Sequence, residues 1–96
     1  MYNVTVNYEK PNCVILNFEE MIEAYSDSLE YCEEIISSFE RKFSHLKNSI
    51  DEPQDYYYII TCDSEEEASE VESYLDESFS NLEEKLEYEL EDSYEY

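Results

Sequence analysis

The last third of the chain carries a helical pattern of apolar residues that limits the fold more than any other feature. From residue 68 onward, apolar side chains recur at spacings of three and four: Ala68, Val71, Leu75, Phe79, Leu82, Leu86 and Leu90. This spacing places them along one side of an α-helix. A helix over 64–91 would extend for ~42 Å at a rise of ~1.5 Å per residue. We therefore expect a helix longer than the small sheet that the rest of the chain can form.

A second apolar pattern predicts another helix, over 27–48. Its members alternate between the same two spacings: Leu29, Cys32, Ile36, Phe39, Phe43, Leu46 and Ile50. The pattern is too short to favour a coiled coil, so we expect this helix to pack on a sheet. The proline-containing segment 51–54 is expected to end it.

Both helices are preceded by a possible capping pair. Asp27 is followed three residues later by Glu30, and Asp63 is followed at the same distance by Glu66. In such a pair the first side chain accepts hydrogen bonds from exposed backbone amides, while the glutamate reaches back. The spacing therefore predicts a helix N-terminus at each place.

Three segments have the composition of β-strands. Residues 2–9 alternate apolar and polar side chains, the period of a half-buried strand, and 13–18 form a short run rich in β-branched residues. The turn at 10–12 would join them as a hairpin. Aromatic and β-branched residues over 56–62 predict a third strand, and the second strand could extend through 21–25 after a bulge.

These elements predict an α+β fold of order β-β-α-β-α. The three strands would form a small, mainly antiparallel sheet, with both helices packed on the same face of it. A chain of 96 residues has room for one domain, so we expect 1–96 to fold as a single unit with 92–96 as a frayed acidic tail. An apolar content of 42% supports a folded core.

The sequence shows no sign of secretion or membrane insertion. Residues 1–9 lack the basic start and apolar run of a signal peptide, and no apolar segment is long enough to span a bilayer. The cysteines, Cys13, Cys32 and Cys62, form an odd set without CxxC spacing, which favours reduced core thiols over disulfides. We therefore expect a cytoplasmic protein.

Several kinds of catalytic and metal chemistry are disfavoured. The chain contains no glycine, so it lacks the loops that cradle nucleotide phosphates and the turn that an EF-hand needs. His45, the one histidine, has no second imidazole or paired thiol at ligand spacing and is expected to face solvent. A meeting of His45 with Cys13 or Cys62 would be the remaining route to a nucleophile. We expect no catalytic residue, no cofactor and no metal site.

The net charge is the strongest indication of function. The chain has 27 acids and 5 Lys or Arg residues, a formal net charge of −22, and self-repulsion at this charge destabilises the compact state. Residues 1–47 hold nine acids and four bases, a net of −5, whereas 48–96 hold eighteen acids and one base, a net of −17. A balance this uneven predicts a basic partner.

On a helical wheel, the acids of the long helix form two rows beside its apolar stripe, which we call the flank ridge and the back ridge. The flank ridge contains Glu65, Glu72, Asp76, Glu83 and Glu87, and the back ridge contains Glu66, Glu70, Glu77, Glu84 and Glu91. Both are expected to face outward and to bind the partner, because an ordinary solvated face would mix Glu with Lys. Tyr74 and Tyr88 are further interface candidates, since amphipathic rings suit protein interfaces.

The density of these acids predicts imitation of phosphates. Between residues 64 and 91 the chain holds twelve acids. Over ~42 Å they give one carboxylate per ~3.5 Å, close to the ~3.4 Å between phosphates along one DNA strand. The long helix could therefore stand in for a phosphate backbone.

With its acidic run over 63–92 and its net charge of −17 over the second half, the chain resembles the small acidic DNA mimics of bacteriophages and mobile elements. This class includes anti-CRISPR proteins, anti-restriction proteins and inhibitors of uracil-DNA glycosylase. The resemblance implies an inhibitor in the bacterial host cell, whose carboxylates pair with the Arg and Lys side chains that would hold DNA. An anti-CRISPR protein that blocks DNA binding by a Cas effector such as Cas9 is the function we expect first.

Two other functions fit the same charge. The chain could be an acidic adaptor or antitoxin that neutralises a basic partner unrelated to DNA, or its surface could be an adaptation to high salt. Neither a nucleic acid nor a membrane is expected as a direct partner. The sequence leaves open which protein is the target and whether the chain is a monomer or a dimer.

Overall fold

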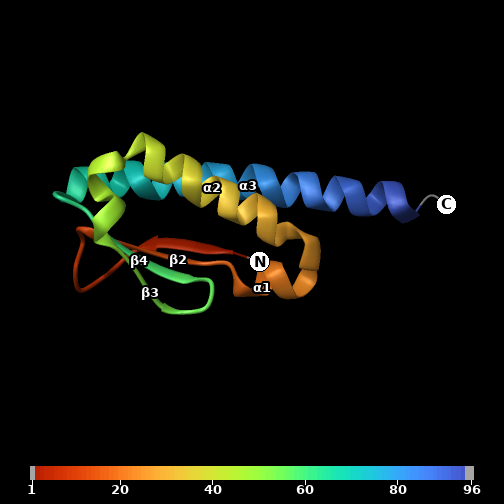
Figure 1. Ribbon diagram of the computed structural model, residues 1–96, viewed down its shortest axis with the longest axis horizontal. Helices are drawn as coiled ribbons and strands as arrows, with labels where there is room; N and C mark the ends of the chain where they lie inside the picture. The colour runs from red at the N-terminus through yellow and green to blue at the C-terminus, as the bar shows by residue number, and fades with distance from the viewer. Residues whose placement is uncertain (1, 95–96) are drawn as a thin grey trace.

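The protein folds into two layers, a four-stranded sheet and a pair of helices packed against one of its faces (Figure 1). The computed structural model describes the backbone of residues 2–94 and the side chains of residues 2–88. The elements are β1 (Asn3–Val6), β2 (Cys13–Asn17), α1 (Glu19–Ala24), η1 (Ser26–Ser28), α2 (Leu29–Lys42), η2 (Ser44–Ser49), β3 (Ile50–Gln54), β4 (Tyr57–Thr61) and α3 (Glu65–Tyr94). The α+β class with a small antiparallel sheet is confirmed, and the prediction of three strands is corrected to four.

The sheet has the strand order β1-β2-β4-β3, and each neighbouring pair is antiparallel. β1 and β2 form the predicted hairpin. β4 pairs with β2 from Cys13 opposite Thr61 to Asn17 opposite Tyr57. These three strands begin and end inside the segments that the sequence predicted for them.

The additional strand, β3, occupies a segment that was expected only to break a helix. It contains Pro53, which has no backbone N–H to donate, and it lies at an edge of the sheet, where that loss is tolerated. A register shift between Asp51 and Gln54 interrupts its pairing with β4. In the turn that follows, Tyr56 has a φ of 62°, a conformation usually taken by glycine, which this chain lacks.

The helix predicted over 27–48 is divided into three pieces. The 3₁₀ turn η1 leads into α2, which ends at Lys42, and the backbone leaves the α conformation at Phe43 (φ −113°, ψ 56°) before the 3₁₀ helix η2. Phe43 and Leu46 are still buried, so the apolar spacing continues beyond the α-helix. Ile50, the last member of that pattern, belongs to β3.

The start of α2 also differs from the prediction. Ser28 occupies the N-cap position, and no side chain forms a capping hydrogen bond there. The Ser28 hydroxyl instead donates to the Tyr25 carbonyl oxygen at 2.6 Å. The predicted capping pair of Asp27 and Glu30 is wrong because η1 runs directly into α2.

Two further segments are helical where the sequence predicted otherwise. Residues 21–25 were considered as a strand extension, but Glu19–Ala24 forms α1 and buries Met21. α3 continues to Tyr94, so part of the predicted tail over 92–96 is helical, and 95–96 lie outside the described residues. None of the helices within residues 2–94 has the apolar stretch that crossing a membrane requires.

The core lies between the sheet and the two long helices. The predicted stripe of α3 is buried from Ala68 to Leu86, while the side chain of Leu90 lies outside the described residues. Phe18, which follows β2, stacks on Phe79 with ring centroids 5.3 Å apart. Full burial of a side chain of this size contributes about 1.5–3 kcal/mol. Core packing therefore fixes which side of α3 is left for solvent.

All three cysteines are free and buried, as predicted. Burial raises the pKa of Cys32 and of Cys62 to about 11. Both groups are therefore neutral thiols at physiological pH, and neither has the lowered pKa of a nucleophile.

Candidate acidic binding surface

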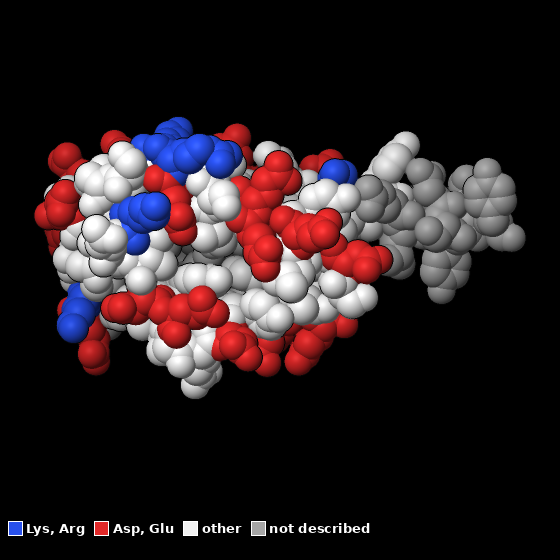
Figure 2. All heavy atoms as spheres, viewed as in Figure 1, with Lys and Arg blue, Asp and Glu red and all other residues white. Residues whose placement is uncertain are grey.

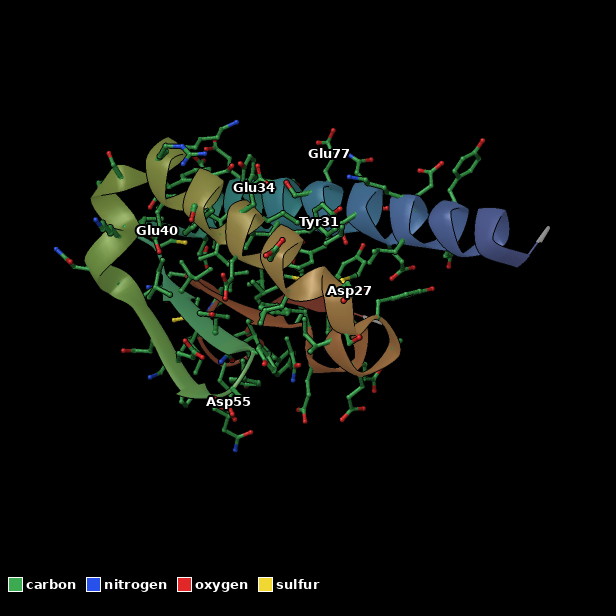
Figure 3. The ribbon with its side chains drawn as sticks, turned by 45° about the vertical axis from the view of Figure 1, so that its right-hand side comes forward. Asp27, Tyr31, Glu34, Glu40, Asp55 and Glu77 are labelled. Carbon is green, nitrogen blue, oxygen red and sulfur yellow. The ribbon has the colours of Figure 1, made fainter. Side chains whose placement is uncertain are left out.

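The back ridge of α3 is exposed over its described length. Its members are Glu66, Glu70, Glu77 and Glu84. Figure 3 shows Glu77 pointing away from the sheet. These positions lie opposite the buried stripe, so the core holds them in solvent. The side chain of Glu91, which was assigned to this ridge, lies outside the described residues.

Two acids of the flank ridge form hydrogen bonds with the first residues of the chain. Glu72 accepts a hydrogen bond from the Val6 backbone N–H at 2.8 Å, and Asp76 accepts one from the Tyr2 hydroxyl at 2.9 Å. Burial raises the pKa of Tyr2, and the Asp76 hydrogen bond and the charge of Glu83 act in the same direction. Glu72 and Glu83 are partly buried, whereas Asp76 remains exposed, as do Glu65 and Glu87.

The two tyrosines proposed as interface residues lie in different environments. Tyr74 packs between α2 and α3, with its ring 5.8 Å from that of Phe43 in an edge-on arrangement and 6.4 Å from that of Phe39. Tyr88 is 67% exposed. Tyr88 therefore presents its ring to solvent, whereas Tyr74 also serves the helix–helix contact.

The N-terminus of α3 is capped one residue later than the sequence predicted. The Glu67 N–H donates to Ser64 Oγ at 3.1 Å, and the Asp63 N–H donates to Glu67 Oε1 at 2.9 Å. Ser64 and Glu67 rather than Asp63 and Glu66 therefore cap the helix, in a variant of the capping box where the glutamate accepts from the N–H of the residue before the cap. Glu66 is left exposed and belongs to the back ridge.

His45 joins η2 to this first turn of α3. Its Nε2 lies 2.6 Å from Glu67 Oε2, although about half of the imidazole side chain is exposed. The hydrogen bonds from the Asp63 backbone and from His45 lower the pKa of Glu67. His45, Asp63 and Glu67 place three donor atoms within 4.8 Å of one another, so they are the described residues that could hold a metal ion. Because both Glu67 oxygens are already bonded, capping alone explains the arrangement.

A second group of acids, on α2 and β3, was not predicted as part of the surface. Burial raises the pKa of Tyr58 to about 12, with further contributions from a hydrogen bond and charge of Glu52 and from the charges of Glu33 and Glu40. Figure 3 shows Glu34 and Glu40 on α2 and Asp27 in η1. The sequence does contain an indication of this second group, a run of acids in the first half of α2. In the charge count these acids were offset by four bases: Lys10, Arg41, Lys42 and Lys47.

Those bases lie mostly toward one end of the molecule. Arg41 and Lys42 end α2, Lys47 follows in η2, and Figure 2 shows most of the basic side chains toward the end where α2 stops. Apart from Glu83, which has an interaction of its own, the one acid among residues 2–88 that lies within ion-pairing distance of a basic side chain is Glu67, beside His45. Lys42 lines a hollow together with Glu70 and Glu77, but it lies over the Tyr74 ring, and no described member of the back ridge forms an ion pair within residues 2–88.

Family models, curated proteins and solved structures yielded no match to this chain.

Proposed function

We propose that this protein is an acidic DNA mimic that occupies the nucleic-acid-binding surface of a basic protein. The observation that carries the proposal is the back ridge, where exposed carboxylates follow one side of α3 without an ion-pairing base among residues 2–88. Acids four residues apart, such as Glu66 and Glu70, repel each other by a few tenths of a kcal/mol in a helix. A cationic partner would remove that cost.

The shape of the molecule supports a nucleic-acid-binding partner. The protein is elongated, measuring 49 × 23 × 20 Å, and α3 extends along its length (Figure 1). The acids of α2 add a second row beside those of α3, as a duplex carries phosphates on two strands. A groove that tracks a nucleic-acid backbone would meet carboxylates over a similar distance.

Within this class, the target that we favour is a Cas effector such as Cas9. Such an effector holds nucleic acid in a positively charged channel and reads a short DNA motif with arginine side chains. Carboxylates of the back ridge would pair with these cations and exclude the DNA. Anti-restriction proteins and glycosylase inhibitors would use the same chemistry on other enzymes.

The experiment is a DNA-competition assay with guide-loaded Cas effectors, a restriction enzyme and uracil-DNA glycosylase. We expect one of these proteins to form a stoichiometric complex with this chain and to lose its DNA. The complex should weaken strongly between about 50 and 200 mM salt. A complex that still binds DNA normally would sink the proposal.

A pair of charge-matched variants tests the ridge itself. The test variant changes the back ridge to glutamine: Glu66, Glu70, Glu77 and Glu84. The control variant changes four exposed acids of the hairpin turn and α1 to glutamine: Glu9, Glu19, Glu20 and Glu23. The two variants have equal net charge, so a loss of inhibition confined to the first assigns the effect to the ridge, whereas equal loss assigns it to charge alone.

A further inference from the structure

A groove runs between α2 and α3 on the side of the back ridge. One hollow of about 320 Å³ includes Tyr31, Glu34, Ser78 and Lys85 in its lining, and a second of about 390 Å³ adjoins it at Tyr74. Figure 3 shows Tyr31 and Glu34 on α2 and Glu77 on α3. The groove therefore combines aromatic surface with acids from both helices.

Both tyrosines in this groove already lie beneath a cation. Lys85 Nζ is 4.3 Å from the centroid of the Tyr31 ring, and Lys42 Nζ is 4.9 Å from the centroid of the Tyr74 ring. These distances are within the range of cation–π attraction. In the most acidic half of the chain the one base is Lys85, and it lies over a ring instead of pairing with a described acid.

We propose that the groove between α2 and α3 receives arginine side chains of a basic partner, which take the places over Tyr31 and Tyr74 that Lys85 and Lys42 occupy in the free protein. A guanidinium group is planar, stacks on aromatic faces and is less strongly hydrated than an ammonium group. Glu34 and Glu77 on the two sides can pair with its N–H groups. The inference rests on the proposed function for the origin of the arginines, and it names the place where they bind.

The first test uses a hexa-arginine peptide with blocked ends as the probe and measures its affinity by titration calorimetry. Lys85→Ala vacates the Tyr31 ring, while Lys47→Ala removes the same charge from an exposed position outside the groove. We expect Lys85→Ala to bind the probe roughly two- to fivefold more tightly than Lys47→Ala does, the size of one exposed cation–π contact. Equal affinities would overturn the proposal.

The second test fills the groove. Ser78→Trp places a large ring in the first hollow, and Ser37→Trp places one at an exposed position of α2 outside both hollows. Circular dichroism establishes that each variant is folded. Weaker probe binding by Ser78→Trp alone supports the proposal, and equal binding by both variants contradicts it.

Ring resonances of the tyrosines provide a direct map of the probe. Tyr31 and Tyr74 should shift on titration, whereas Tyr8, which is 98% exposed and outside the groove, should not. Uniform shifts in all three would indicate nonspecific attraction and would overturn the assignment. None of these measurements requires a DNA-binding protein, so a failure of the groove and a failure of DNA competition are separate results.

Discussion

Glu72 Oε2 lies 2.8 Å from the backbone nitrogen of Val6, so a carboxylate of α3 accepts a hydrogen bond from the outer edge of β1. β1 is an edge strand, and an unpaired N–H at a sheet edge is a template for pairing with another chain. Further along α3, Asp76 accepts a hydrogen bond from the Tyr2 hydroxyl. Part of the acidic surface of α3 therefore fastens the helix to the sheet and covers its edge.

The hydrogen bond to Val6 predicts that Glu72→Ala destabilises the fold although it removes a negative charge from a strongly acidic chain. We expect the free energy of unfolding in urea to fall by about 1–2 kcal/mol, since hydrogen bonds to charged groups contribute about 1.5–3 kcal/mol and some charge repulsion is relieved. Glu77→Ala, on the exposed ridge, should stay within about 0.5 kcal/mol of the wild type. Equal stability of the two variants would show that the contact adds nothing.

The apolar stripe of α3 could be predicted because a long helix packed on one side repeats one period without interruption. The end of α2 could not. Phe43 and Leu46 keep the spacing of three that an α-helix allows, but a 3₁₀ helix such as η2 also returns its side chains to one side every three residues. The spacing therefore continued while the backbone changed, and it concealed the strand that begins at Ile50.

The candidate site likewise has one part that the sequence predicts and one part that it does not. The back ridge follows from the helical wheel alone, because its position depends only on the buried stripe of the same helix. The hydrogen bonds of Glu72 and Asp76 depend on Val6 and Tyr2, which are 66 and 74 residues away in the chain. Local spacing contains no information on such contacts.

Uncompensated charge on the back ridge predicts opposite effects of one substitution on stability and binding. Glu70→Lys replaces the repulsion between residues 66 and 70 with an attractive Glu-to-Lys pair four residues apart, which should raise the free energy of unfolding by about 0.5 kcal/mol. The same change places a positive charge where a basic partner would bind and should weaken DNA competition more than Glu70→Gln does. Urea unfolding and the competition assay measure the two effects. A variant that is more stable and inhibits as well as the wild type would remove Glu70 from the binding surface.

Tyr58 is predicted to lose its hydroxyl proton at a higher pH than an unperturbed tyrosine does. Its pKa in the folded protein is raised to about 12, above the value of about 10 for an unperturbed tyrosine. A raised pKa means that the stability linked to the neutral hydroxyl is fully present below about pH 10 and is lost as the pH rises through about 12. Tyrosinate absorbance should show a component near pH 12 that Tyr58→Phe removes and Tyr8→Phe retains. If Tyr58→Phe leaves that component in place, another tyrosine is its source.

Glu67 is expected to make the fold sensitive to acid. Hydrogen bonds from the Asp63 backbone and from His45 lower its pKa. A lowered pKa means that the linked stability is present above the unfolded value, about 4.3 for glutamate, and is lost as the pH falls through the folded value.

Glu67→Gln and Glu65→Gln each remove one negative charge, and Glu65 is exposed in the same helical turn. At neutral pH, the free energy of unfolding should be lower for Glu67→Gln than for Glu65→Gln, because the substitution at residue 67 weakens the cap and the contact with His45. The difference should shrink as the pH falls below the unfolded value and through the lowered folded one, because Glu67 itself becomes protonated in the Glu65→Gln variant. A gap that stays constant from neutral to acidic pH would mean that the loss comes from altered packing and not from the charged hydrogen bonds.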